Sequence, residues 1–210
     1  MKAENNKAMA AWHEAGHFVS RWICGLKPAG VRVFKDAAGN WVGRTDGTGE
    51  AISPVGAFMG ADMPFYSSAG LTSEMLARRW SYAEISVAWR TILERHASED
   101  GEDDISAILS PCLVDSLKVV FFRKLENATP VGLRAAICSA GAVLLRDNWD
   151  KVTMVKRVLF CREIKKVDAV RLFSEFGHCD SSDSIRRMTR ILGPIDKTFD
   201  PFFAKRKRRA

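Results

Sequence analysis

The chain has 210 residues, of which 47% are hydrophobic and 27% are charged, so it can bury the core of one globular domain. Its five cysteines are widely spaced and form no C-x-x-C pair, which argues against a disulfide framework and against a metal site built from cysteines. The sequence has neither a signal-peptide pattern nor an apolar run of about 18 residues. We therefore expect a cytoplasmic protein without a membrane span.

The net charge of +7 is concentrated at the C-terminal end. Residues 181–210 carry nine basic and three acidic side chains and end in KRKRRA. Such a segment could bind nucleic acid, an acidic partner or anionic lipid through charge alone, or it could simply be a solubilising tail. We expect one domain over residues 1–180, followed by a flexible basic tail over residues 181–210.

The first predicted element is a helix over residues 5–24. Its apolar residues recur at spacings of three and four, which is typical of one buried helix face, and they are Met9, Trp12, Gly16, Val19 and Ile23. Gly25 follows directly, as expected after a helix end. Two short β-prone runs, residues 31–34 and 41–45, flank a turn that contains Gly39 and Asn40, and they predict a hairpin.

The remaining segments before the basic tail are predicted to be mostly helical. Helical patterns occupy residues 73–95, 104–123, 130–146, 149–161 and 167–176. Thr129 before Pro130 is a typical helix start. The predicted fold class is therefore mainly α with a small β-hairpin or sheet, within the α+β class.

The first helix contains the sequence HEAGH at residues 13–17, an HExxH motif. Residues four apart project from one helix face, so His13 and His17 can direct their imidazoles at a single zinc ion. Zinc lowers the pKa of a bound water, and Glu14 beside it can accept a proton as the water attacks a peptide carbonyl, then pass it to the leaving amine. The pattern predicts His13 and His17 as metal ligands and Glu14 as the catalytic base of a peptidase.

The motif by itself leaves two questions open. HExxH arises by chance in about one in a few hundred chains of this length, so its helical context matters. Catalytic zinc also usually takes three protein ligands, and the third histidine of an HExxHxxGxxH pattern is absent. No pattern supports His96 or His178 as a ligand. We therefore expect a carboxylate to complete the site.

The HEAGH helix resembles the peptidase domain of the FtsH family, which are membrane-bound, ATP-dependent zinc proteases. Residues 69–74, AGLTSE, are similar to the AGxxAE segment of that family, with Ser for the second Ala. Residues 102–105, EDDI, resemble its acidic SNDI or SNDL segment, and residues 144–152 and 160–164 are similar to its closing helices. The resemblance implies a zincin-like HExxH helix followed by a helical bundle.

The same resemblance implies further site residues. Asp104, directly before Ile105, matches the third zinc ligand, and Asp103 is the alternative because the acidic run allows a shift of one residue. Without the resemblance, the sequence favours a helix cap or a surface charge for either aspartate. Glu74 matches a carboxylate that orients a ligand histidine, with an exposed helix charge as its alternative. The implied cofactor is one zinc ion per chain.

The predicted hairpin gains a role from the resemblance. Metallopeptidases bind an extended substrate at a strand edge through main-chain hydrogen bonds, which favours broad specificity. The resemblance implies that the hairpin supplies this edge, and a plain covering hairpin is the alternative. The residues concerned are Val31, Arg32, Val33, Phe34, Trp41 and Val42.

The sequence also departs from the FtsH family, because it has no GxxxxGK[ST] phosphate loop and no apolar span. We therefore expect an ATP-independent zinc endopeptidase that cleaves unfolded or flexible polypeptides, with selection left to a separate regulator or adaptor protein. One alternative is a zinc-binding module that acts by holding a protein partner. Another is a nucleic-acid-associated regulator that acts through its basic tail, although the neutral body and the lack of a recognition motif count against it.

Overall fold

The computed structural model describes residues 2–46, 62–96, 105, 108 and 130–177. These residues form a mainly helical structure with a small antiparallel sheet, as the sequence predicts at the level of fold class. The strands are β1 (Val31–Lys35) and β2 (Trp41–Thr45). The helices are α1 (Lys2–Ile23), α2 (Asp62–Ala77), α3 (Tyr82–Arg95), α6 (Pro130–Asp147), α7 (Trp149–Cys161) and α8 (Lys166–Phe176).

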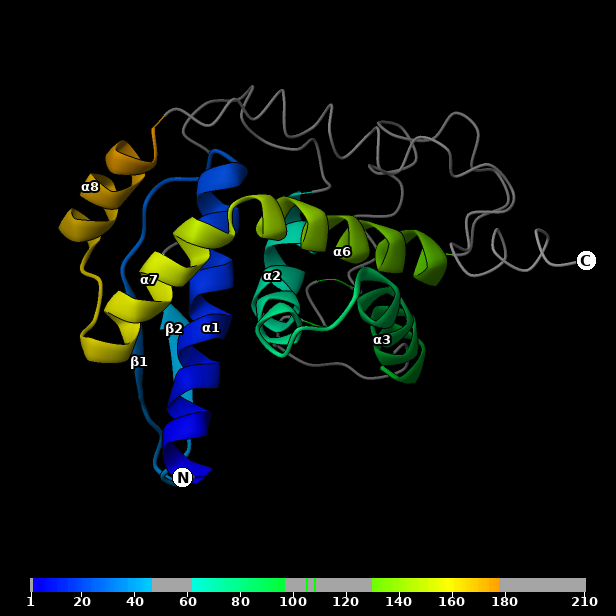
Figure 1. Cartoon of the computed structure of the whole chain (residues 1–210), viewed down its shortest axis with the longest axis horizontal. Helices are drawn as coiled ribbons and strands as arrows, with labels where there is room; N and C mark the ends of the chain where they lie inside the picture. The colour runs from blue at the N-terminus through cyan, green and yellow to red at the C-terminus, as the bar shows by residue number, and fades with distance from the viewer. Residues whose placement is uncertain (1, 47–61, 97–104, 106–107, 109–129, 178–210) are drawn as a thin grey trace, which may run out of the picture.

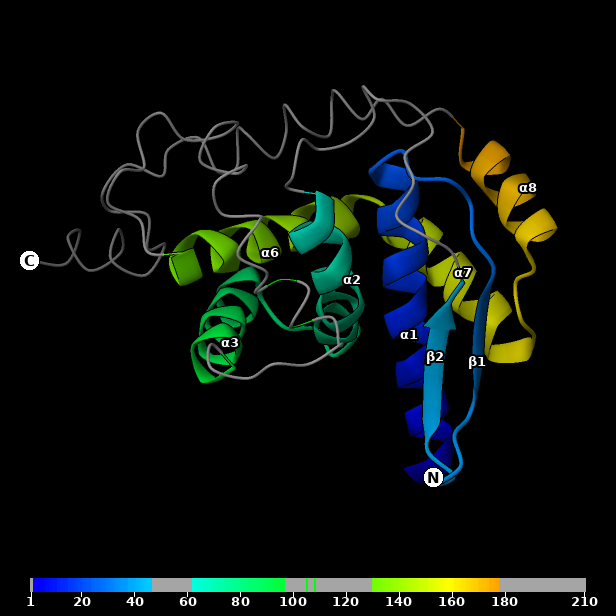
Figure 2. The ribbon, with the colours of Figure 1, turned by 180° about the vertical axis from the view of Figure 1, so that it is seen from behind.

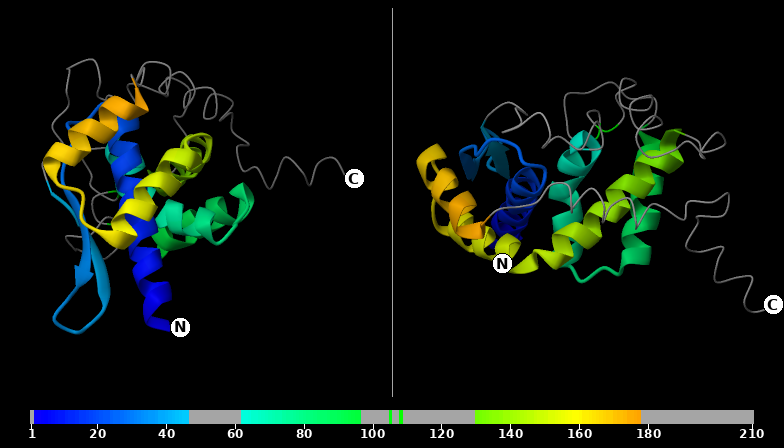
Figure 3. Two further views of the ribbon diagram at one scale, coloured as in Figure 1. Left: turned by 60° about the vertical axis from the view of Figure 1, so that its left-hand side comes forward. Right: turned by 90° about the horizontal axis from the view of Figure 1, so that it is seen from above.

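Helix α1 is the central element of the fold. It packs against α2, against α7 and against both strands. Figure 1 shows α2, α3 and α6 on one side of it and the hairpin and α8 on the other, and the view from above in Figure 3 shows the same order. Every residue from Glu14 to Arg21 is buried. The predicted single apolar face is therefore wrong for this stretch, because different elements cover different sides of the helix.

A close crossing brings α2 against the middle of α1. A Cβ on Gly16 would collide with the carbonyl oxygen of Ala69 and would lie 2.7 Å from Cβ of Ser73. The Ser73 hydroxyl also donates a hydrogen bond to the carbonyl of Trp12. Because Gly16 has no side chain, the two helices approach closely enough for α2 to contact the HEAGH segment.

The predicted hairpin is confirmed. Strands β1 and β2 pair antiparallel, with Val31 opposite Thr45 and Lys35 opposite Trp41. In the turn, Gly39 adopts a φ of 83°, a left-handed conformation that glycine adopts without steric cost. Val31 also exchanges two main-chain hydrogen bonds with Ile164, between α7 and α8. Figure 2 shows the hairpin lying alongside α1, with β2 in front of the helix.

The prediction of one helix over residues 73–95 is wrong, because the chain forms two helices there. Arg79 adopts a left-handed φ of 64° between α2 and α3, and Ser81 then caps α3. The Ser81 hydroxyl accepts a hydrogen bond from the Glu84 amide, and the Glu84 carboxylate accepts from Ser81 in return. These bonds to Ser81 lower the pKa of Glu84. This capping box outweighs the continuous apolar spacing.

The later elements agree with the sequence where the structure describes them. The predictions for residues 130–146, 149–161 and 167–176 are confirmed within one residue by α6, α7 and α8. Most of the predicted helix over residues 104–123, and the whole basic tail, lie outside the described residues. Among the helices that are described, none has the length and apolar character needed to cross a membrane.

Candidate metal centre

The two histidines of the HEAGH motif meet at the crossing of α1 and α2. Their Nε2 atoms lie 3.1 Å apart, and their ring centroids are separated by 4.8 Å. His17 is buried, with 5% of its surface exposed, while His13 reaches the cleft beside the helix. The convergence expected from the four-residue spacing is therefore present.

The contacts of the two Nδ1 atoms determine which ring nitrogen of each histidine carries the proton. His13 Nδ1 lies 2.8 Å from Glu74 Oε1, and His17 Nδ1 lies 2.9 Å from the carbonyl oxygen of Tyr66. An ionised carboxylate and a carbonyl oxygen can only accept, so each Nδ1 must donate a proton. In the neutral imidazoles, both Nε2 atoms then carry lone pairs. Two lone pairs thus face each other at the convergence point.

This arrangement fits a zinc ion. Two facing lone pairs repel unless a cation or a shared proton lies between them. Nitrogen ligands bind tetrahedral zinc at about 2.0–2.1 Å, which places two of them about 3.3 Å apart, close to the separation of the two Nε2 atoms. The Glu74 carboxylate and the Tyr66 carbonyl hold the rings as outer partners of metal-ligating histidines do. His13 and His17 thus have the chemistry and spacing of a ligand pair.

Gly70 of α2 leaves the room for this convergence. A Cβ on Gly70 would collide with Nε2 of both His13 and His17. Gly70 lies within the AGLTSE segment, but the sequence alone does not indicate that it faces the histidines. Its position in the middle of a helix, where glycine costs stability, is the one signal that could have drawn attention to it.

Glu14, the residue after His13, is directed toward β2. Its carboxylate is buried, with 4% of the residue exposed, and Thr45 Oγ1 donates a hydrogen bond to Oε2 at 2.7 Å. Its side chain lies against Gly43, where a Cβ would collide with it. Sequence reasoning missed both contacts, because Thr45 and Gly43 follow in a separate element with no motif of their own. The carboxylate is thus held by one defined donor.

A cleft of about 410 Å³ runs between α1, β2 and the C-terminal end of α2. His13, Glu14 and Glu74 line it, and so do Trp41 and Val42 of the predicted substrate strand. The β1 residues predicted to bind substrate, Val31, Arg32, Val33 and Phe34, are not among its lining residues. The cleft therefore borders β2 and not β1.

The edge of β2 carries main-chain groups directed away from β1. Val31 directs its amide and carbonyl at Ile164, and in an antiparallel pair this direction alternates along each strand. Its partner Thr45, and with it Gly43 and Trp41, must then direct their main-chain groups outward from β2. This edge offers donors and acceptors to another extended chain.

A third ligand is not found within the described ranges, where no group of three or more His, Cys, Asp or Glu side chains is arranged to hold a metal ion. Asp104 and Asp103 lie outside those ranges. Glu74 contacts His13, and it also lies 3.6 Å from Arg78. Comparisons of the chain with protein-family models, with characterised proteins and with solved structures find no match.

A cysteine nucleophile is a poor alternative in the described part of the chain. Burial raises the pKa of the Cys138 thiol to about 12, so it stays protonated at neutral pH. Cys24 is also buried, and Cys161 is exposed at the end of α7. Neither thiol lines the cleft that holds His13 and Glu14.

Proposed function

We propose that the chain is an ATP-independent zinc endopeptidase that hydrolyses peptide bonds in unfolded or flexible polypeptides. The observation that carries this proposal is the 3.1 Å separation of the two Nε2 atoms, with each Nδ1 bound to an acceptor. A buried carboxylate, Glu14, follows His13 on the same helix. The FtsH resemblance and its zincin-like architecture point to the same reaction.

The histidines would hold the metal, and the resemblance adds Asp104 as third ligand. Bound there, zinc would polarise the substrate carbonyl and lower the pKa of water at the site. Glu74 and the Tyr66 carbonyl keep the two imidazoles in the tautomer whose Nε2 can bind a metal. The protein thus supplies oriented ligands before any substrate arrives.

Glu14 is the base in this proposal. Thr45 holds one carboxylate oxygen, and the site excludes most solvent around the group. Glu14 would accept a proton from the attacking water and deliver it to the leaving amine. A fixed carboxylate is favourable here, because it needs no rearrangement when the proton moves.

The substrate would lie along β2. An extended polypeptide can pair with the outward main-chain groups of Trp41, Gly43 and Thr45, and this pairing does not depend on substrate sequence. The cleft between β2 and α1 would then place a peptide bond near His13 and Glu14. Strand β1 would support β2 from behind, through its ladder and its bridge to Ile164.

The experiment that tests the proposal measures zinc and hydrolysis together. The purified chain should hold one zinc ion and cleave unfolded casein without ATP, and a chelator should stop cleavage until zinc is restored. A chain that holds zinc but cleaves nothing would instead be a module that binds a protein partner. A chain that binds no zinc would exclude both the peptidase and the zinc-binding module. The remaining alternative would then be the regulator that acts through its basic tail.

Glu74→Ala is expected to weaken zinc binding by about 10- to 100-fold, because His13 loses the carboxylate that fixes its tautomer and orientation. The measurement is competition for zinc with a chromophoric chelator. Arg78→Ala is the control, because it removes the 3.6 Å ion pair and leaves the contact between Glu74 and His13 intact. Equal zinc affinity in Glu74→Ala and the wild type would contradict the role of Glu74.

Thr45→Val is expected to lower kcat by about 10- to 100-fold, which corresponds to one hydrogen bond to a charged group. Valine keeps the size and β-branching of threonine but removes the donor to Glu14. KM and zinc content should stay at wild-type values, and Thr45→Ser should restore most of the activity. Steady-state kinetics on a fluorogenic peptide provide the measurement, and an unchanged kcat would exclude a positioning role.

A further inference from the structure

The side chains of the hairpin are divided between two faces. Thr45 Oγ1 donates a hydrogen bond to Glu14, and a Cβ on Gly43 would collide with the same side chain, so these positions of β2 face α1. Successive side chains of a strand point to opposite faces. The residues between these positions, and their partners on β1, therefore form an outer face directed away from α1. The outer face consists of Arg32, Phe34, Val42 and Arg44.

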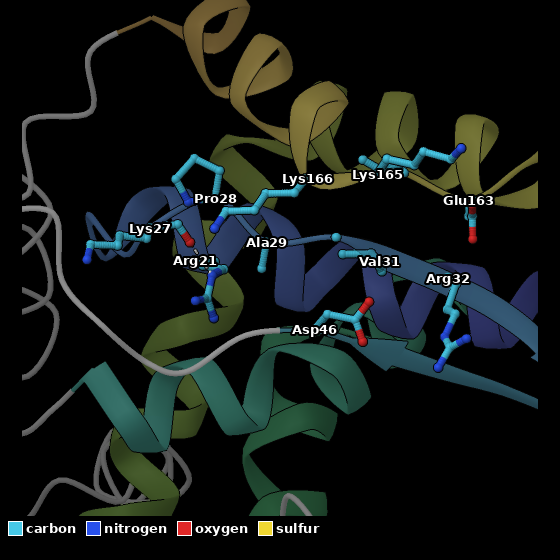
Figure 4. Close-up of a pocket in the computed structure, with 12 residues that line it drawn as sticks. Arg21, Lys27, Pro28, Ala29, Val31, Arg32, Asp46, Glu163, Lys165 and Lys166 are labelled. Carbon is cyan, nitrogen blue, oxygen red and sulfur yellow. Dashed lines mark hydrogen bonds between the residues drawn. The ribbon is translucent and has the colours of Figure 1, made fainter.

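The outer face is open to solvent. Arg32 and Arg44 are exposed, and Phe34 is 37% exposed although its side chain is large and apolar. None of these three residues lines the cleft beside the histidine pair. Figure 4 shows the side chain of Arg32 extending from β1 toward β2, with α1 behind the two strands. A ligand of this face therefore does not need to enter the metal cleft.

Two arginines stand directly opposite each other on the outer face. Arg32 pairs with Arg44 in the register of the hairpin. Because Val31 directs its main-chain groups at Ile164, Arg32 and Arg44 form the adjacent hydrogen-bonded pair, whose Cα atoms are about 5.5 Å apart. Like charges directly opposite each other destabilise an antiparallel pair. An anion bound between the two guanidinium groups would remove this repulsion.

Carboxylates offset the charge of the hairpin only in part. Its two strands contain Arg32, Lys35 and Arg44 but neither Asp nor Glu. Asp46 lies 3.7 Å from the Arg44 guanidinium, but both side chains are more than half exposed, and such pairs contribute little. Asp36 accepts hydrogen bonds from two amides of its own turn. The arginine pair therefore still attracts an anion.

An aromatic ring lies beside the arginine pair. The Arg32 guanidinium lies 5.1 Å from the centroid of the Phe34 ring, and the two residues are about 7 Å apart along β1. Guanidinium groups bind phosphates with two parallel hydrogen bonds, and exposed aromatic rings stack on bases. This combination is typical of surfaces that bind single-stranded nucleic acid. The acidic side chains of a polypeptide would satisfy the arginines but would give the ring nothing to stack on.

We propose that the outer face of the hairpin binds single-stranded nucleic acid. Arg32 and Arg44 receive a phosphate of the backbone, and a base stacks on the ring of Phe34. Contacts of this kind do not depend on nucleotide sequence. The proposal goes beyond the proposed peptidase function and needs neither zinc nor hydrolysis, because the side chains that carry it face away from α1.

The test measures the binding of the full chain to short, fluorescently labelled single strands by fluorescence anisotropy. The probes are DNA and RNA of one sequence, and an abasic strand of the same length that carries the same phosphates without bases. The wild type should bind the strands with bases at least about fivefold more tightly than the abasic strand. Phe34→Val should remove this preference, because valine suits a strand but has no ring.

Arg32→Gln should weaken binding to all three strands by about tenfold and lower the salt dependence of binding, because a phosphate contact is lost. Arg171→Gln is the matched control, since Arg171 is an exposed arginine of α8 whose Nε lies 2.8 Å from the Glu175 carboxylate. It should bind as the wild type does. Arg32→Gln also removes one of two opposed charges, so its Tm should not fall below that of the wild type.

The same measurements can overturn the proposal. Equal affinity for strands with and without bases would show charge attraction alone, to which the basic tail also contributes. Equal losses in Arg32→Gln and Arg171→Gln would show that the hairpin has no special part in binding. If polyglutamate of equal charge competes as well as the oligonucleotides, and Phe34→Val changes neither affinity, the face binds an acidic polypeptide instead. Tighter binding of RNA or of DNA would keep the proposal and identify the preferred strand.

Discussion

Glu14→Gln should abolish hydrolysis while the protein keeps its zinc. Glutamine has the size of glutamate, and its amide oxygen can still accept the hydrogen bond from Thr45. It cannot take up a proton from water, however, so the general-base step is lost. General acid and base groups contribute about 10²- to 10⁴-fold, and we expect kcat to fall at least about 100-fold. Casein cleavage and zinc content, measured on the same sample, check this result.

Glu94→Gln is a suitable control, because it makes the same chemical change at an exposed position on α3. It should alter neither zinc content nor activity. A Glu14→Gln protein that holds zinc and cleaves at the wild-type rate would show that another group is the base. If wild type and variant both hold zinc and neither cleaves, the chain is a binding module that has kept its metal.

Gly70→Ala should disrupt the histidine pair, with a loss of zinc affinity of at least about 100-fold. The added Cβ would lie 2.5 Å from Nε2 of His17 and even closer to Nε2 of His13, so at least one ring must move away. Alanine is favoured over glycine inside a helix by about 1 kcal/mol, so propensity alone would make the variant more stable. A lower zinc affinity would therefore result from the collision between the added Cβ and the histidine rings. Zinc competition and thermal unfolding without metal provide the measurements.

A double-mutant cycle isolates this collision from other effects of the methyl group. In a His13→Ala/His17→Ala background the clashing rings are gone, so Gly70→Ala should become neutral or stabilising, by up to about 1 kcal/mol. A Gly70→Ala protein that binds zinc as tightly as the wild type would contradict the geometry at the crossing of α1 and α2. Gly70→Ala is thus expected to be disruptive in the wild type and neutral or stabilising in the His13→Ala/His17→Ala background.

The features predictable from sequence are those encoded within one element. HExxH places its two histidines on one turn of one helix, so their convergence follows from local geometry alone. The hairpin and helices α6, α7 and α8 also carry their own turn and apolar patterns. The division between α2 and α3 had a local signal too, in the spacing of Ser81 and Glu84, but the apolar pattern across it suggested a single helix.

The features that sequence did not reveal join elements far apart in the chain. Tyr66 and Glu74 contact histidines that lie 49 and 61 residues earlier, and Thr45 contacts Glu14 across 31 residues. Glu74 was predicted from the FtsH resemblance and not from any local pattern. Thr45 is an ordinary strand residue, and Gly70 gives only the signal of a glycine inside a helix, so their roles appear only when the elements pack. Asp104 stays a prediction, because it lies outside the described residues.

The burial of α1 from Glu14 to Arg21 means that Glu14 and His17 belong to the interior of the domain and not to a surface loop. A ligand that binds only the native chain raises its stability by mass action, so zinc at His13 and His17 would act on the whole domain. Folding and metal uptake would then be thermodynamically linked. Substitutions around the metal would change the lifetime of the protein as well as its turnover, and the supply of zinc in the cell would set how much of the chain persists.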